Sequence, residues 1–151
     1  MLNQVVLMGR PGKDPEIKHS RDGARKFATF RMATTEKWKD KSSGERKEAT
    51  EWHNVVVYNE GLVNLVEKYV RKGKLIYLSG KLQTRSWKGD DGKDRYATEV
   101  VLKAFDGEIK ILEWPDDDDA RSAREEYKSR DRAPPKHEKS FDKGMDDEIP
   151  F

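Results

Sequence analysis

The sequence has no cysteine and no long apolar run. Without cysteine, disulfides and thiolate metal sites are excluded, which fits a reducing compartment such as the cytoplasm. No stretch approaches the roughly 18 apolar residues of a membrane span. Residues 2–9 already follow a strand pattern, with no basic region before them as a signal peptide would have. We therefore expect a cytoplasmic protein that does not enter a membrane.

The sequence also has few residues that could build a metal or catalytic site. The histidines His19, His53 and His137 are scattered and have no ligand spacing. Adjacent carboxylates in the acidic run 116–119 lack the fixed geometry that magnesium demands. No serine or threonine occupies a nucleophile-elbow setting, and no carboxylate pair stands out. We expect no cofactor, no metal and no enzyme activity, with a nuclease as a distant alternative.

Charge is abundant and unevenly distributed. The chain is 40% charged, 34% hydrophobic, and has a mean hydropathy of -1.05. Residues 1–114 hold 23 Lys and Arg against 17 Asp and Glu, a net +6, whereas residues 115–151 hold 8 against 12, a net −4. A basic body with an acidic tail predicts a polyanionic partner for the body and a separate role for the tail.

The stretch 50–58 is rich in β-branched and aromatic residues and is predicted to be a strand. Because side chains alternate along a strand, Val55 and Val57 should face the core. Trp52 and Tyr58 should share the opposite face, roughly 20 Å apart. Two large aromatics on that face indicate either a second buried layer or subunit contact, or a stacking platform for bases.

Other segments complete an all-β pattern with one helix. Strands are predicted at residues 4–9, 25–34, 74–87, 95–104 and 108–112, and an apolar stripe at helical spacing predicts a helix at 60–72. Asn59 can cap the start of this helix, and Gly73 suits the left-handed position after its end. Gly80 in mid-strand favours a sharp bend at a barrel corner. The charged, aperiodic stretch 39–47 is predicted to be a flexible loop.

This order of elements suits a five-stranded Greek-key barrel of the oligonucleotide-binding kind, the OB-fold, with one α-helix between strands 3 and 4. An open sheet with a covering helix fits almost as well. We place the barrel domain at residues 1–113. Residues 114–143 read as a charged, disordered linker, with a transient helix possible over 120–132, and residues 144–151 as an acidic interaction tip. The apolar Ile149 and Phe151 at the end of such a tail cannot contribute to a core.

Aromatic residues interleaved with cations favour binding of single-stranded nucleic acid. The candidate stacking residues are Trp38, Trp52, Tyr58 and Trp87, and the candidate phosphate contacts are Lys39, Lys41, Arg46, Lys81, Arg85 and Lys88. A duplex reader would instead need a recognition helix with polar base-reading residues, and the predicted helix is too apolar on its stripe. The competing interpretation is that some of these aromatics are buried in the core or an interface.

Several motifs resemble the bacterial single-stranded DNA-binding protein family. They are Val5-Val6-Leu7-Met8-Gly9, Lys13-Asp14-Pro15-Glu16, Thr50-Glu51-Trp52-His53, Tyr69-Val70-Arg71-Lys72-Gly73, Gly80-Lys81-Leu82-Gln83-Thr84-Arg85, Asp94-Arg95-Tyr96-Ala97-Thr98-Glu99-Val100 and the tip Asp146-Asp147-Glu148-Ile149-Pro150-Phe151. The resemblance covers residues 3–113 and 146–151, and the pairing of body and tip is highly specific.

The resemblance implies an OB-fold that assembles as a homotetramer and wraps single-stranded DNA in replication, recombination and repair. It also implies a nucleoid-associated location in the cytoplasm. It places Trp38, Trp52 and Trp87 on the family's base-stacking tryptophans and Tyr58 where the family often has a phenylalanine. It also implies that the tip, Asp146, Asp147, Glu148, Ile149, Pro150 and Phe151, docks replication and repair proteins. His53 falls on a position that the family uses at a subunit contact, and we expect Tyr77 at the interface too.

The linker departs from the family pattern, because family linkers are often long and rich in Gly, Gln and Pro, whereas this one is short and charged. Cooperative packing along DNA is therefore in doubt, but binding is not. One alternative of another class stays open. The chain could be a non-catalytic adaptor that uses the barrel for assembly and the tail for recruitment.

Overall fold

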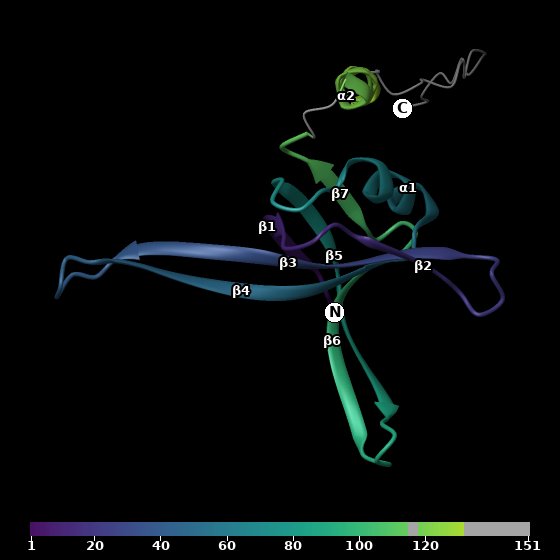
Figure 1. Cartoon of the computed structure of the whole chain (residues 1–151), viewed down its shortest axis with the longest axis horizontal. Coiled ribbons are helices and arrows are strands. Elements are labelled where there is room, and N and C mark those ends of the chain that lie inside the picture. The colour runs from purple at the N-terminus through teal and green to yellow at the C-terminus, as the bar shows by residue number, and fades with distance from the viewer. Residues whose placement is uncertain (115–117, 132–151) are drawn as a thin grey trace, which may run out of the picture.

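The computed structural model describes residues 1–114 and 118–131 of the chain (Figure 1). Its elements in chain order are β1 (Val5–Pro11), β2 (Glu16–His19), β3 (Lys26–Lys39), β4 (Arg46–Val57), α1 (Glu60–Tyr69), β5 (Ile76–Lys88), β6 (Asp94–Leu102), β7 (Glu108–Ile111) and α2 (Asp118–Asp131). The predicted tip at 144–151 and the end of the predicted linker lie outside the described residues. Within the described part of the chain, no helix has the length and apolarity to cross a membrane.

Five strands close into a barrel because β1 pairs on both sides. It pairs antiparallel with β5 through residues 5–9 and with β3 through residues 10–11. The ring continues from β3 to β4, from β4 to β6 in parallel, and from β6 back to β5. α1 lies between the third and fourth barrel strands. The predicted five-stranded OB-fold is therefore confirmed. The short strand β2, which pairs with β3, was not predicted.

Two glycines occupy the corners of the barrel. At Gly80, β5 leaves β1 and β7 and begins to pair with β6, and a Cβ there would lie 2.8 Å from the Val101 carbonyl oxygen. The corner predicted at Gly80 is therefore confirmed. At Gly9, β1 passes from β5 to β3, and a Cβ there would overlap the carbonyl oxygen of Ala33. Each corner needs a residue without a side chain because two strands approach closely.

α1 covers one end of the barrel core, with Val63 and Val66 fully buried. The predicted cap is confirmed, because Asn59 Oδ1 accepts a hydrogen bond of 3.0 Å from the Leu62 amide. Gly73 has the predicted left-handed conformation, with φ 78°. The helix ends at Tyr69, three residues before the predicted end at residue 72. The amide of Val70 still bonds to Val66, but its own ψ of 122° is extended and stops the helix.

Two long β-hairpins extend from the barrel, one formed by β3 and β4 and one by β5 and β6 (Figure 1). The loop predicted at 39–47 is shorter in the structure and spans residues 40–45, because Lys39, Arg46 and Lys47 belong to paired strands. Two backbone hydrogen bonds of 2.8 Å close the turn. The Asp40 amide donates to the Glu45 carbonyl oxygen, and the Gly44 amide donates to the Asp40 carbonyl oxygen. Lys47 and the Ser42 groups hold the pKa of the Asp40 carboxyl well below its usual range. Charged residues on both strands hid the alternation that marks a strand.

The end of the barrel domain is fastened to its beginning. Arg10 forms a forked ion pair with Glu113, with nitrogen–oxygen distances of 2.5 and 2.7 Å. This pairing lowers the pKa of Glu113 to about 2. Trp114, one residue beyond the boundary predicted at 113, packs its ring 5.2 Å from the ring of Tyr69. The folded body thus includes Trp114.

The predicted linker contains a regular element, α2, at Asp118–Asp131. The sequence analysis allowed only a transient helix there. Between residues 118 and 131 the chain has neither proline nor glycine and carries good helix formers such as alanine, arginine and glutamate. Arg121 and Glu125 are spaced i, i+4, which supports a helix through side-chain charge. α2 lacks an apolar stripe, as the sequence indicated.

Candidate nucleic-acid interface

All four predicted stacking residues are on the surface. Trp38, Trp52, Tyr58 and Trp87 are 48%, 49%, 49% and 41% exposed. Val55 and Val57, on the opposite face of β4 from Trp52, are 1% and 0% exposed. Period-two alternation therefore placed Trp52 and Tyr58 on the outer face correctly, but Val56, which shares that face, is buried at 5% exposure. The interpretation of the four rings as core residues of the chain is excluded.

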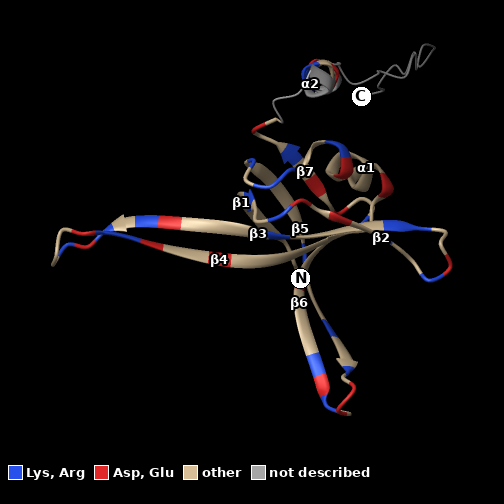
Figure 2. Cartoon of the chain, in the orientation of Figure 1, with Lys and Arg blue, Asp and Glu red and all other residues tan. Residues whose placement is uncertain are grey.

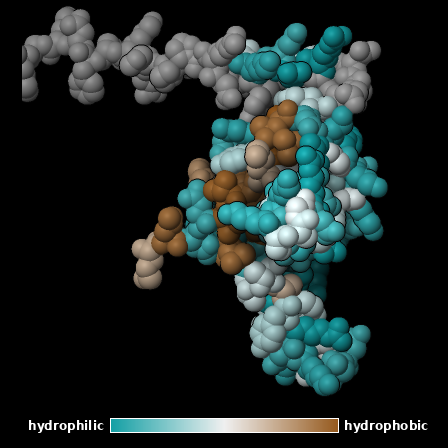
Figure 3. Space-filling model, turned by 90° about the vertical axis from the view of Figure 1, so that its left-hand side faces the viewer, coloured by the Kyte–Doolittle hydropathy of each residue, from teal (hydrophilic) through white to brown (hydrophobic). Residues whose placement is uncertain are grey.

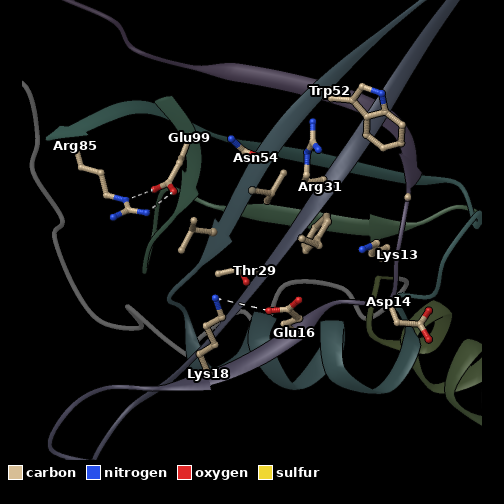
Figure 4. Close-up of a pocket in the computed structure, with 14 residues that line it drawn as sticks. Lys13, Asp14, Glu16, Lys18, Thr29, Arg31, Trp52, Asn54, Arg85 and Glu99 are labelled. Atoms are coloured by element: carbon tan, nitrogen blue, oxygen red, sulfur yellow. Dashed lines mark hydrogen bonds and ion pairs between the residues drawn. The ribbon is translucent and has the colours of Figure 1, made fainter. Parts of the chain in front are cut away.

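Trp52 lies at the rim of a groove of about 410 Å³ (Figure 4). Its ring packs over the backbone of Gly12, where a Cβ would come within 2.5 Å of the indole. The guanidinium carbon of Arg31 lies 5.3 Å from the centroid of the same ring, a cation–π distance. Register places Trp52 beside Ala33 and Asn54 beside Arg31. The indole is therefore in contact with the backbone of β1 and close to a cation of β3.

The groove contains both cations and carboxylates. Arg85 donates two hydrogen bonds of 3.2 Å to Glu99, which raises the pKa of Arg85. Lys18 lies 3.7 Å from Glu16. Within residues 1–114 and 118–131, neither Lys13 nor Arg31 has a carboxylate in ion-pair distance. These two cations are the ones best placed to meet a phosphate.

Arg31, Lys13 and Lys18 were not among the residues predicted for the site. For Arg31 a signal existed, because it alternates with Phe30 and Met32, which are buried. Strand parity therefore already placed Arg31 on the outer face. Lys13 lies in the turn before the unpredicted strand β2, and Lys18 lies within β2. No local pattern indicates that this strand borders Trp52.

A second hollow of about 470 Å³ lies around Trp38 near the tip of the β3–β4 hairpin. It is lined by Lys37, Trp38, Lys39, Arg46, Lys47 and Glu48. Lys39 and Arg46 are cross-strand partners, and neither forms an ion pair within the described part of the chain. Figure 2 shows cations and carboxylates together toward the tips of both hairpins. The structure thus brings Trp38 together with two of the predicted cations.

On the β5–β6 hairpin, the Arg85 guanidinium carbon lies 4.9 Å from the centroid of the Trp87 ring. Lys81, nearer the barrel, is paired with Asp106 at 2.7 Å. Lys88 is exposed opposite Asp94. Lys41 is also exposed, in the turn between β3 and β4. Of the predicted cations, Lys81 and Arg85 therefore already have a carboxylate partner.

Tyr58 lies where β4 ends and packs its ring 5.6 Å from that of Phe27. Its backbone amide donates a hydrogen bond of 2.9 Å to the Leu102 carbonyl oxygen. This bond joins the end of β4 to the end of β6. A hollow of about 450 Å³ beside Tyr58 is lined also by His19, Gly23, Ala24, Arg25, Lys26 and Glu60. Tyr58 therefore borders a hollow that lies against the β2–β3 hairpin.

The two residues predicted at a subunit interface lie on different strands. His53 on β4 is half-buried, and its Nε2 lies 2.8 Å from the hydroxyl of Thr34. Tyr77 on β5 is half-buried under Lys110, whose Nζ lies 6.0 Å from the ring centroid. Beside Tyr77, Val6 and Met8 of β1 are 53% and 61% exposed. Figure 3 shows an apolar area on one face of the molecule.

Among the described residues, no three His, Asp or Glu side chains gather as a metal site would require. The interface is therefore made of aromatic rings, cations and ion pairs. Such groups can stack with a flat ring and neutralise an anion.

A family model described as "Single-strand binding protein family" matches residues 2–117. The chain belongs to this family. The match covers the barrel and both hairpins. A single-stranded DNA-binding protein of Rickettsia felis is 46% identical over 153 residues, covering 99% of this chain and 97% of that protein. One of Rhizobium meliloti is 42% identical over 171 residues, covering 99% and 98%.

A solved family structure supports the same assignment at the level of the fold. The structure titled "Plasmodium falciparum SSB complex with ssDNA" aligns with a TM-score of 0.68 and 40% sequence identity. The alignment covers 75% of this chain and 97% of the chain in that structure. That single-strand binding protein was solved with single-stranded DNA, as its title says.

Proposed function

We propose that this chain binds single-stranded DNA without sequence preference and protects it in replication, recombination and repair. The observation that carries the proposal is the set of half-exposed rings, Trp38, Trp52, Tyr58 and Trp87, each within reach of cations. Every base has a π-face, so stacking on these rings tolerates any sequence. Family membership and the ssDNA complex of a relative support the same conclusion.

In this proposal the cations neutralise phosphates and make binding dependent on salt. Lys39, Lys41, Arg46 and Lys88 are the predicted contacts that have no ion-pair partner within the described residues. Arg31 and Lys13 join them because they border Trp52 without a carboxylate partner. Arg85 contributes by exchanging Glu99 for phosphate. Lys81 can meet a phosphate while it stays paired with Asp106, because its ammonium group has three donors. The role is binding without catalysis.

The proposal is tested by titrating the full-length chain with oligo-dT and with duplex DNA of equal length, following tryptophan fluorescence. Stacked bases should quench the exposed indoles, and the duplex should quench far less because its bases are already stacked. Log affinity should fall linearly with log salt concentration. If oligo-dT causes no quenching, the adaptor interpretation replaces this one.

We propose further that the chain assembles as a homotetramer. Residues 5–9 of β1 pair with β5 on one side only, and an open strand edge is a template for another chain. Val6, Met8 and Tyr77 give the adjoining sheet face an apolar surface to bury. His53 is the other predicted interface residue.

Light scattering at two concentrations should give a mass near four times that of the 17.5 kDa chain. A Met8→Glu variant should give a lower mass, and a monomeric mass for the wild type would contradict the proposal.

The terminal residues 146–151 are proposed to recruit replication and repair proteins in the cytoplasm. Their sequence combines three carboxylates with Ile149, Pro150 and Phe151, which a partner with a basic rim and an apolar slot could capture. Deleting residues 146–151 should abolish such recruitment and leave oligo-dT affinity equal or higher, because an acidic tail competes with DNA for the basic body. Weaker DNA binding by the truncated chain would contradict this competition.

A further inference from the structure

Phe105, in the turn between β6 and β7, has two unusual properties. Its side chain is 105% exposed, as much as in an extended chain. Its φ is 71°, and it is the one non-glycine residue with a positive φ among the described residues. A bulky residue in this region is strained by roughly 1–2 kcal/mol. Strained residues that persist often mark functional positions.

The turn that carries Phe105 is tied down from both sides. Asp106 is paired with Lys81 on β5 at 2.7 Å. Gly107 packs against Leu102, where a Cβ would lie 2.8 Å from the Leu102 Cβ. The phenyl ring is therefore presented to solvent from a fastened turn. The exposure and the strain belong to one defined conformation.

The turn that carries Phe105 begins close to Tyr58. The Tyr58 amide bonds to the Leu102 carbonyl oxygen at 2.9 Å, so the end of β4 adjoins the end of β6. Phe105 follows Leu102 by three residues, at most about 11 Å of backbone. A strand of nucleic acid leaving Tyr58 in this direction would meet Lys103 and then the Phe105 ring.

We propose that Phe105 is a further base-stacking residue, beyond the four rings already described. The proposal rests on the proposed function. The chemistry around the ring favours a nucleobase over an apolar protein surface. The neighbours in the turn are Lys103, Ala104 and Asp106, and an apolar protein contact would need a continuous patch of a few hundred Å². A single ring beside a cation matches stacking with phosphate neutralisation.

The test compares full-length Phe105→Gly and Phe105→Tyr with the wild type on oligo-dT of about sixteen nucleotides, the upper range for one OB barrel. Phe105→Gly should weaken binding about tenfold. It should not lower the thermal midpoint, because glycine adopts the positive φ without strain. Phe105→Tyr keeps the ring and should bind as the wild type does.

Two outcomes would overturn the proposal. Phe105→Gly could bind oligo-dT as tightly as the wild type, or it could reduce the mass by light scattering, which would make the ring a subunit contact. Trp52→Ala, measured alongside, separates this inference from the proposed function. If Trp52→Ala loses affinity and Phe105→Gly does not, the function stands and the inference fails. If the wild type itself does not bind oligo-dT, the function fails.

Discussion

Replacing Trp52 by alanine is expected to weaken oligo-dT binding about tenfold or more, because stacking of one base contributes roughly 1–3 kcal/mol. Trp52 should have the largest effect of the four rings. It borders the groove of about 410 Å³, and Gly12 and Arg31 hold its indole in place. A ring already held in position loses little freedom when a base stacks on it.

The measurement is fluorescence titration with oligo-dT at one fixed salt concentration. Trp52→Phe keeps a smaller ring and should lie between the wild type and the alanine variant. Trp114→Phe is the matched control, because Trp114 packs against Tyr69 and lies outside the proposed surface. It should leave affinity unchanged. Since Trp52 is 49% exposed, the thermal midpoint of Trp52→Ala should stay near that of the wild type. Undiminished binding by Trp52→Ala would contradict its stacking role.

Replacing Gly9 by valine is expected to destabilise the fold by roughly 3 kcal/mol or more, at or above the upper end of usual overpacking costs. A Cβ at Gly9 would overlap the Ala33 carbonyl oxygen of β3. The obstacle is backbone, so no side chain can rotate away. β1 must then separate from β3 at the point where the barrel closes.

Urea unfolding of the two chains under identical conditions checks this expectation. Gly23→Ala is the matched control. Gly23 has φ 70°, but a Cβ added there would have no heavy atom of another described residue within 4 Å, its chain neighbours aside. It should cost about 1 kcal/mol, from backbone strain alone. Equal stability of Gly9→Val and Gly23→Ala would show that β3 can shift to make room, and would contradict the close approach as the reason for glycine.

Local patterns predicted the faces of the strands well. Alternation along 50–58 separated the buried Val55 and Val57 from the exposed Trp52 and Tyr58. The glycine in mid-strand at Gly80 marked a barrel corner, and Asn59 marked the start of α1. These features depend on neighbouring residues of one strand or one helical turn. For that reason these features can be predicted without knowing which strand or helix packs against the segment.

Contacts between distant strands were not predictable in the same way. Nothing near Arg31 in the sequence shows that it lies 5.3 Å from the Trp52 ring, or that Gly12 packs against that ring. The pairing of Arg85 with Glu99 across β5 and β6 also depends on register. The outer ends of β3 and β4 were not predicted as strands, because they pair through charged residues that show no apolar alternation.

The sequence by itself therefore determined the order of the five barrel strands and of α1, the core face, the exposed rings, the family resemblance and the charge difference between body and tail. Only the tertiary structure decided which cations have carboxylate partners, which glycine lies where β1 closes the barrel, and that Phe105 projects from a fastened turn beyond Tyr58. The physical reason is that side-chain alternation has a range of a few residues. Barrel closure and strand register bring together residues that are far apart in the chain.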